Sequence, residues 1–250
     1  MTIRADPARY DLDIVPAASL LADPARAAML TALLDDRPLA AGELGRLAGV
    51  SPATASAHLA RLLAGGLVTV ASQGRHRHYR LAGPEVAAAI EALGQLSRPA
   101  PVRSLRESRQ AAALAEARTC YDHLAGRAGV ALLDALLARG LLTGVPSAHQ
   151  PTGAPLSAGP AGFALTAAGQ ATLQAFGIDI AALRRSRRQF AGPCLDWTER
   201  RPHLNGALGA AITGRLVDRG WIQPGPRRRA VRVTPAGRAG LAATFGCPGD

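Results

Sequence analysis

The chain contains no lysine, so arginine supplies all 29 of its basic side chains, against 18 aspartates and glutamates. The formal net charge of +11 favours an anionic partner, because the field of a basic protein attracts polyanions. Arginine-only usage with abundant alanine, glycine and leucine is also what a GC-rich genome produces. The charge therefore supports an anionic partner without identifying it.

Long apolar runs are also missing. No segment approaches the length needed to cross a bilayer, and the opening residues, MTIRADPARYDLD, lack the apolar core of a signal peptide. We therefore expect a cytoplasmic protein with no membrane partner. Cysteine is scarce, and three is an odd number, which favours free thiols over a disulfide framework.

Enzyme signatures are absent as well. The sequence has no glycine-rich phosphate loop, no GxSxG elbow and no metalloprotease helix motif. A hydrolase built on the CxD and His residues described below would be the only enzyme candidate. We therefore expect a protein that is not an enzyme.

What is present near the N-terminus is a series of three short helices. Asp23 can cap the first of them, and the second, within Leu39 to Val50, has Gly49 available to end it in the left-handed region. Ser51 then caps a third helix with Pro52 at its first position. This layout is typical of a helix-turn-helix, in which the third helix enters the DNA major groove.

The third helix carries small polar side chains among alanines that would let it sit deep in a groove. Hydroxyl, imidazole and guanidinium groups on its outward side can reach base edges or phosphates. The residues predicted to contact DNA from this helix are Ser51, Thr54, Ser56, His58 and Arg61.

A basic hairpin follows, in GLVTVASQGRHRHYRL from Gly66 to Leu81. Its alternating pattern is that of two paired strands, and cations at the end of a projecting ribbon suit the sugar-phosphate backbone. We assign Arg75 and Arg77 to that backbone and add His76 and Tyr79 to the predicted DNA contacts.

The segments ADPARAAMLTALL, SPATASAHLARLLAGGLV and GRHRHYRL resemble the ArsR/SmtB family of winged-helix repressors, over roughly residues 15 to 97. The resemblance implies a homodimer, joined through the first and last helices of this domain, that binds a palindromic operator in double-stranded DNA and releases it on a signal. In the last helix, Val86, Ile90, Leu93 and Leu96 can pack against a partner, or within one subunit.

The metal sites of that family are not found here. Where its metal sensors carry a cysteine pair on the second helix, this chain has ELGRLAGV, and its last helix offers only Glu91 in place of Asp and His ligands. A small-molecule, metal or oxidant effector would therefore act elsewhere.

The expected fold is mainly α with small β-hairpin wings, an α+β class. We predict a winged helix-turn-helix and dimerisation domain at residues 1–97, a linker at 98–105 and a second domain at 106–250. The second domain is expected to resume with a long helical pattern from Leu105 to Gly126.

Within the second domain a pattern occurs twice, predicting two winged-helix-like copies at about 106–179 and 180–250. CxD stands at Cys120–Asp122 and at Cys194–Asp196, and HLxGxxG begins at His123 and at His203. In both copies an Arg-Gly turn follows the histidine by sixteen positions, and a strand with T-x-x-G comes next.

If the copies pack about a pseudo-two-fold axis, their matching polar side chains approach each other. The residues concerned are Cys120, Asp122, His123, Cys194, Asp196 and His203. Such a set could bind zinc or a similar divalent ion, Cys120 and Cys194 could act as a redox switch, or the residues could simply pack. Cys247, near the end of the chain, is expected to be frayed.

The prediction is therefore a dimeric DNA-binding repressor whose second domain senses a signal. The alternatives are a thiol-based redox or metal sensor that uses Cys120 and Cys194, and a DNA-binding protein that needs no effector.

Overall fold

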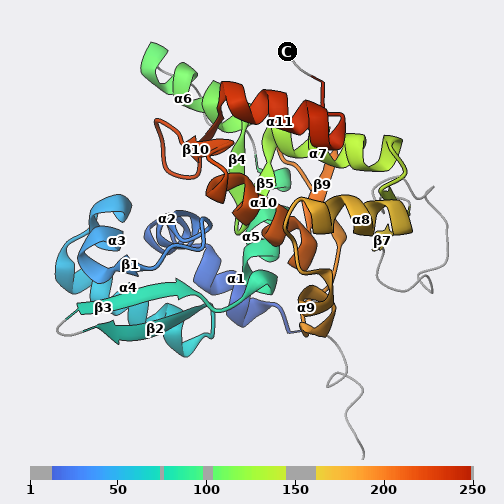
Figure 1. Cartoon of the computed structure of the whole chain (residues 1–250). Helices are drawn as coiled ribbons and strands as arrows, with labels where there is room; N and C mark the ends of the chain where they lie inside the picture. Colours follow the sequence, from blue (N-terminus) through green and yellow to red (C-terminus); the bar gives the residue numbers. More distant parts are fainter. Residues whose placement is uncertain (1–12, 74–75, 98–103, 145–161, 249–250) are drawn as a thin grey trace, which may run out of the picture. The chain divides into compact units, whose positions relative to one another are not determined.

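The structure is a computed structural model that describes residues 13–73, 76–97, 104–144 and 162–248. It is mainly helical with short antiparallel hairpins. The chain divides into two compact units, an N-terminal unit, Met1–Val86, and a C-terminal unit, Ala87–Asp250 (Figure 1). Each is described by itself.

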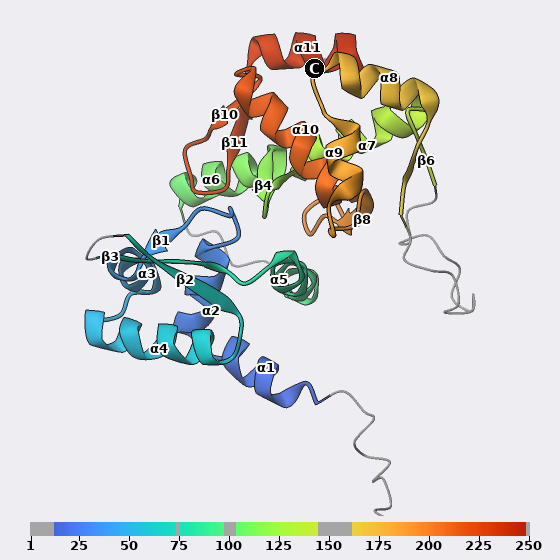
Figure 2. The same ribbon diagram turned by 60° about the horizontal axis from the view of Figure 1, so that its bottom comes forward.

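The N-terminal unit is a winged helix-turn-helix. Its elements are α1 (Val15–Leu21), α2 (Pro24–Ala32), β1 (Leu39–Ala40), α3 (Ala41–Ala48), α4 (Pro52–Ala64), β2 (Val68–Gln73) and β3 (His76–Leu81). The strands form one antiparallel sheet in the order β1-β3-β2. Helix α3 packs on α2 and α4, and α4 contacts the base of the hairpin at β2 (Figure 2).

The ends of these helices are where the sequence places them. The Asp23 carboxylate accepts a hydrogen bond from the Arg26 amide, and the Ser51 hydroxyl accepts one from the Thr54 amide. Gly49 ends α3 with φ of 67°, in the left-handed region. Arg26 is itself buried and donates to the Ser19 and Leu20 carbonyls at the end of α1.

The core of the N-terminal unit is aliphatic. Its fully buried side chains include Met29, Leu30, Leu33, Leu44, Leu59 and Leu62. They come from α2, from the residue that ends it, and from α3 and α4, so burial of one stripe on each helix fixes the three helices against one another.

The C-terminal unit takes in most of α5 and everything after it. Its first elements are α5 (Pro84–Leu96), α6 (Leu105–Glu116), β4 (Arg118–Cys120), β5 (His123–Ala125), α7 (Gly126–Ala138), β6 (Leu142–Thr143), β7 (Ala164–Leu165) and α8 (Ala167–Ala175). The chain continues through α9 (Ile180–Arg185), β8 (Gly192–Leu195), β9 (Pro202–Asn205), α10 (Gly206–Asp218), β10 (Ile222–Pro224), β11 (Val231–Val233) and α11 (Pro235–Phe245).

The long helix expected from Leu105 to Gly126 is wrong. Helix α6 ends at Glu116, Ala117 is already extended with φ of −153°, and β4 and β5 form a hairpin instead. Tyr121, with φ of 58°, makes the turn of that hairpin. The apolar pattern of this segment is helical, but a single residue in the left-handed region, Tyr121, is enough to reverse the chain direction and form a tight turn.

Two stretches of the C-terminal unit repeat one order of elements: hairpin, helix, hairpin, helix. The first runs from β4 to α8 and the second from β8 to α11. The threonine of each T-x-x-G caps the last helix, because Thr166 accepts from the Gly169 amide and Thr234 from the Gly237 amide. That each stretch is a winged-helix-like copy stays a prediction.

The two stretches pack crosswise. Helix α7 lies on β9 and helix α10 lies on β5, so each helix covers a strand of the other stretch. A Cβ atom on Gly129 would fall 2.4 Å from the Leu124 carbonyl oxygen, and one on Gly209 would fall 2.4 Å from that of Leu204. The second glycine of each HLxGxxG is therefore required by close packing of a helix on its own hairpin.

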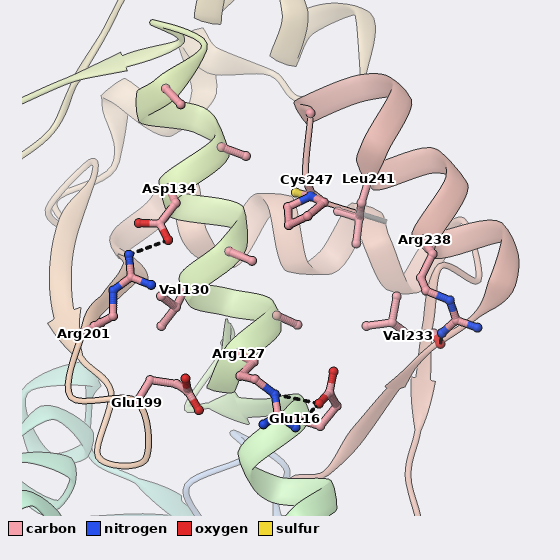
Figure 3. A pocket seen from close by; sticks show the side chains of 16 residues that line it. Glu116, Arg127, Val130, Asp134, Glu199, Arg201, Val233, Arg238, Leu241 and Cys247 are labelled. Carbon is pink, nitrogen blue, oxygen red and sulfur yellow. Dashed lines mark hydrogen bonds and ion pairs between the residues drawn. The ribbon is translucent and has the colours of Figure 1, made fainter. Parts of the chain in front are cut away.

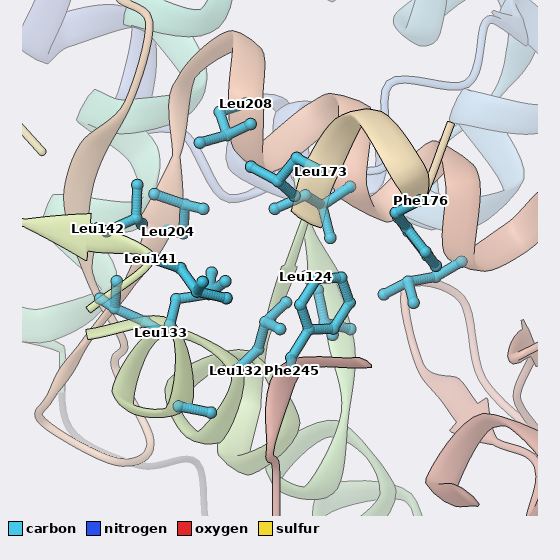
Figure 4. Close-up of a cluster of buried hydrophobic side chains, with 14 of the residues drawn as sticks. Leu124, Leu132, Leu133, Leu141, Leu142, Leu173, Phe176, Leu204, Leu208 and Phe245 are labelled. Carbon is cyan, nitrogen blue, oxygen red and sulfur yellow. The ribbon is translucent and has the colours of Figure 1, made fainter. Parts of the chain in front are cut away.

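A single apolar cluster underlies both stretches (Figure 4). It includes Leu124, Leu133, Leu136, Phe176, Leu204, Leu208 and Phe245. Among the described residues, no helix combines the length and the apolar character that a membrane span requires.

Most of the predicted linker, residues 98–103, lies outside the described residues. The described chain resumes at Ser104, which caps α6 by accepting from the Glu107 amide. Helix α5, which we predicted as the last helix of the first domain, groups mainly with the C-terminal unit.

Candidate DNA-reading helix and candidate metal centre

Helix α4 presents a polar outer face. Thr54, Ser56 and Arg61 are exposed, whereas Ala55, Leu59 and Leu62 are buried on the opposite side. The Ser56 hydroxyl donates to the Pro52 carbonyl at 2.9 Å, and this still leaves its oxygen lone pairs facing solvent. The exposed face is small enough to enter a major groove.

His58 does not share that face, so its predicted outward orientation is corrected. Its side chain is only 15% exposed, and its Nδ1 lies 3.7 Å from the Asp23 carboxylate. Although His58 comes one helical turn after Thr54, its imidazole is turned toward the Asp23 side chain at the start of α2. It is a contact between α4 and α2.

Tyr79 is also corrected. It is 6% exposed and stands opposite Val70 and Leu39 in the sheet, so the ring belongs to the core and is not available to DNA. Arg77 is exposed on β3. Arg75 lies outside the described residues, and so does the side chain of His76, although its backbone is part of β3.

The apolar residues of α5, the predicted dimerisation helix, differ in how exposed they are. Val86 and Ile90 are half-buried, whereas Leu93 is 43% exposed and Leu96 is 83% exposed. Glu91 is buried and forms an ion pair with Arg229, so the one acidic residue in the middle of this helix is engaged inside the C-terminal unit.

The C-terminal unit brings four metal-ligating side chains together. Cys120 and His123 stand opposite each other in the β4–β5 hairpin, and Cys194 and His203 stand opposite each other in the β8–β9 hairpin. One ligand atom from each of the four lies within 4.8 Å of the others. The matching positions of the repeated pattern therefore meet.

Within this cluster like atoms face like atoms. The Cys120 and Cys194 sulfurs are 3.9 Å apart, and the His123 and His203 Nε2 atoms are 3.2 Å apart. Cys120, His123 and His203 are buried, and Cys194 is half-buried. The two imidazole rings are stacked, with centroids 5.1 Å apart.

Each histidine has a carboxylate behind it. The His123 Nδ1 is 3.3 Å from Asp122, and the His203 Nδ1 is 3.6 Å from Asp196. Both predicted aspartates therefore lie beside the cluster, next to the Nδ1 atoms of the histidines, while the two Nε2 atoms face each other.

Two arginines hold these aspartates, and neither was predicted. Arg188 pairs with Asp122, and Arg118, which is fully buried, donates to Asp196 at 2.9 Å. Neither arginine belongs to the repeated pattern: Gly192 stands two residues before Cys194, where Arg118 stands before Cys120. The duplication therefore could not mark them.

These arginines keep both carboxylates charged. Burial works against ionisation, but Arg188 and His123 hold the pKa of Asp122 at about 2. Likewise, despite burial, Arg118, Thr198 and backbone amides hold the pKa of Asp196 at about 2.

The pKa values of the two histidines are shifted in opposite directions. Burial opposes the charge on His123, but Cys120 and Asp122 outweigh it and raise its pKa to about 9. Burial and the neighbouring His123 lower the pKa of His203 well below its usual range. The Cys194 hydrogen bond and burial raise the pKa of the Cys120 thiol.

Cys247 is not frayed, contrary to expectation. It is 8% exposed and joins the apolar core, where burial raises its pKa to about 11. It also lines a groove of about 720 Å³ between α7 and α11 (Figure 3). The rim of this groove carries two ion pairs, Arg127 with Glu116 and Arg201 with Asp134.

One known protein is similar over 90% of this chain, and a domain model matches its N-terminal part. A helix-turn-helix domain model matches residues 21–71. The HTH-type transcriptional regulator YdfF of Bacillus subtilis (strain 168) is 41% identical over 226 residues, which are 90% of this chain and 94% of that protein.

Two solved structures match over a smaller share. HlyU from Vibrio cholerae N16961 is 34% identical and covers 33% of this chain and 88% of its own, with a TM-score of 0.30. The homodimeric winged helix-turn-helix domain of Mb0332 from Mycobacterium bovis, a possible ArsR-family transcriptional regulator, is 33% identical and covers 38% of this chain and 88% of its own, with a TM-score of 0.33. Because the match to YdfF extends through both units, the chain belongs to the family of HTH-type transcriptional regulators that includes YdfF.

Proposed function

We propose that this regulator is a dimeric repressor that reads a palindromic operator through α4 and releases it when the C-terminal unit receives a signal. The observation that carries the proposal is the Ser51-capped helix α4, whose exposed face bears Thr54, Ser56 and Arg61. Hydroxyls can bond to base edges, and a guanidinium binds phosphate or guanine. A repressor of this kind would act on the chromosome, so we expect the protein in the cytoplasm.

Dimerisation is supported by apolar side chains left on the surface of α5. Leu93 and Leu96 are 43% and 83% exposed, and they lie on successive turns of the helix. Two copies of one such face can cover each other about a two-fold axis, and a two-fold protein matches a palindromic site.

Helix α5 also offers a route for the signal. It begins at Pro84, directly after the winged sheet, and its Gln95 side chain donates to the Leu195 carbonyl, next to Cys194. A change at the β8–β9 hairpin would therefore act on the helix that we propose joins the two copies.

Mobility shifts with the DNA upstream of the protein's own gene test the reading role. We expect the double variant Thr54→Ala, Ser56→Ala to lose roughly 5- to 150-fold in preference for that DNA over an unrelated duplex, which corresponds to about 1–3 kcal/mol. The matched control is Ser108→Ala, an exposed helical serine of the C-terminal unit, which should bind like the wild type. Equal affinity of the wild type for every duplex would identify an architectural DNA-binding protein and reject the repressor.

A further inference from the structure

We propose that Cys120, His123, Cys194 and His203 bind one zinc ion in a closed tetrahedral site. The proposal concerns a site in the C-terminal unit and holds whether the regulator represses or activates. Thiolate and imidazole are common zinc ligands, and a tetrahedron of two sulfurs and two nitrogens is typical of structural zinc sites.

The separations between like atoms fit such an ion. With zinc–sulfur bonds of about 2.3 Å and zinc–nitrogen bonds of about 2.0–2.1 Å, a tetrahedron has a sulfur–sulfur edge of about 3.8 Å and a nitrogen–nitrogen edge of about 3.3 Å. The protein has 3.9 Å between the cysteine sulfurs and 3.2 Å between the histidine Nε2 atoms. Since no two of the four ligand atoms are more than 4.8 Å apart, small side-chain rotations complete the tetrahedron.

The facing Nε2 atoms of the two histidines leave room for one cation to bind both rings. If each Nδ1 keeps its proton toward the carboxylate behind it, Asp122 or Asp196, both Nε2 atoms point lone pairs at each other across 3.2 Å. A metal ion accepts both lone pairs at once. Carboxylates behind ligating histidines are the usual support of zinc sites.

Charge is also balanced around the proposed ion. Two cysteine thiolates neutralise Zn²⁺, and neutral imidazoles add nothing. Each aspartate behind a histidine is neutralised by its own arginine, Asp122 by Arg188 and Asp196 by Arg118. No unpaired charge is therefore left in a buried place, where it would be costly.

Each of two hairpins supplies two ligands to the site. Its ligands come from two hairpins, β4–β5 and β8–β9, whose cysteines are 74 positions apart in the sequence. All four positions of the tetrahedron belong to the protein, which is the arrangement of structural zinc and leaves no open position for a substrate. Zinc would hold the two crosswise-packed stretches together.

Metal content of the purified full-length protein is the direct test. We expect about one zinc per chain by mass spectrometry of the metal, and, after exchange with Co²⁺, the intense visible bands of tetrahedral thiolate coordination. Cys194→Ser, which changes the half-buried ligand, should lose most of the zinc. Cys247→Ser removes a buried thiol outside the cluster and should keep it.

A second readout does not depend on the variants folding equally well. Removal of zinc from the wild type with a chelator should lower the thermal midpoint by about 5 °C or more, and returning zinc should restore it. Circular dichroism in the far ultraviolet would confirm that Cys194→Ser is folded before its metal is counted.

Three results would overturn the proposal. One is wild-type protein that takes up neither zinc nor tetrahedral cobalt after growth and purification with added metal. Another is zinc that remains in both Cys120→Ser and Cys194→Ser, which places it elsewhere. The third is a metal-free protein whose mass shows a Cys120–Cys194 disulfide, which makes the pair a redox switch. Each leaves DNA binding by α4 to be judged separately by the mobility shifts.

Discussion

Among single residues, Ser51 illustrates how much one side chain can stabilise. Its hydroxyl accepts the Thr54 amide hydrogen bond that starts α4, so Ser51→Ala leaves that amide without its partner. We expect a loss of about 1 kcal/mol in the free energy of unfolding, measured by urea titration. Ser56→Ala, five positions along the same helix and also exposed, should stay within about 0.5 kcal/mol. Equal effects of the two changes would mean that the cap does not stabilise α4.

Gly209 and Gly214 make a sharper comparison, because both are in α10. A Cβ on Gly209 would meet the Leu204 carbonyl at 2.4 Å, whereas a Cβ on Gly214 would meet nothing within 4 Å. Gly209→Ala should therefore destabilise by about 1–3 kcal/mol through overpacking. Gly214→Ala should be neutral or stabilise by up to about 1 kcal/mol, since alanine favours helix. If thermal unfolding ranks the two variants the other way, the close packing of α10 on its hairpin is wrong.

Arg118 is the buried cation of the C-terminal unit on which Asp196 depends. Arg118→Met fills similar space but leaves the carboxylate without its guanidinium, and we expect a loss of about 3–5 kcal/mol. The matched change on an exposed arginine of the same unit, Arg106→Met, should cost less than about 0.5 kcal/mol. Denaturant titration checks both, and a small effect at Arg118 would show that Asp196 finds another partner.

At this scale the sequence predicts what is local and misses what depends on distant neighbours. The caps at Asp23 and Ser51 and the left-handed Gly49 are confirmed, because each follows from two or three adjacent residues. His58 is instead turned toward Asp23, and Tyr79 is buried in the sheet, because neighbours distant in the sequence decide both positions. Contact of the remaining predicted residues with DNA stays a prediction.

At the scale of elements, α4 should act through both its polar face and its charge. Arg61, on the last turns of the helix, is exposed and free to meet a phosphate. Arg61→Ala should weaken binding to all duplexes alike and lower the slope of log affinity against log salt by about 1. Fluorescence anisotropy across a salt series measures this. An unchanged slope would remove Arg61 from the phosphate contacts.

Helices and strands were predictable where capping or turn residues mark their ends. Helices α2, α3 and α4 begin or end at residues that the sequence marks, and the β2–β3 hairpin follows from alternation. The β4–β5 hairpin was not foreseen, because its signal is one tyrosine at φ of 58° inside a helical pattern. That hairpin carries half of the proposed zinc ligands. The helical periodicity of its sequence therefore led to a wrong prediction for an element that the site requires.

At the scale of the whole molecule, the repeated pattern foretold which side chains would meet. The equal spacing predicted that Cys120 and His123 approach Cys194 and His203 if the copies pack about a pseudo-two-fold axis, and these four side chains do form one cluster. The supporting arginines could not be foreseen, because Arg118 and Arg188 have no counterparts in the other copy. A repeated pattern predicts only the residues that both copies share, and it cannot predict residues that occur in one copy alone.

The central claim is that two copies of α4 read one symmetric site in DNA. A footprint of the full-length protein on the DNA upstream of its own gene measures this directly. We expect two protected half-sites whose centres lie about 10–10.5 base pairs, or a multiple of that, apart, as two recognition helices of a dimer require. A single unsymmetrical footprint, or no protected site at modest ionic strength, would contradict the claim.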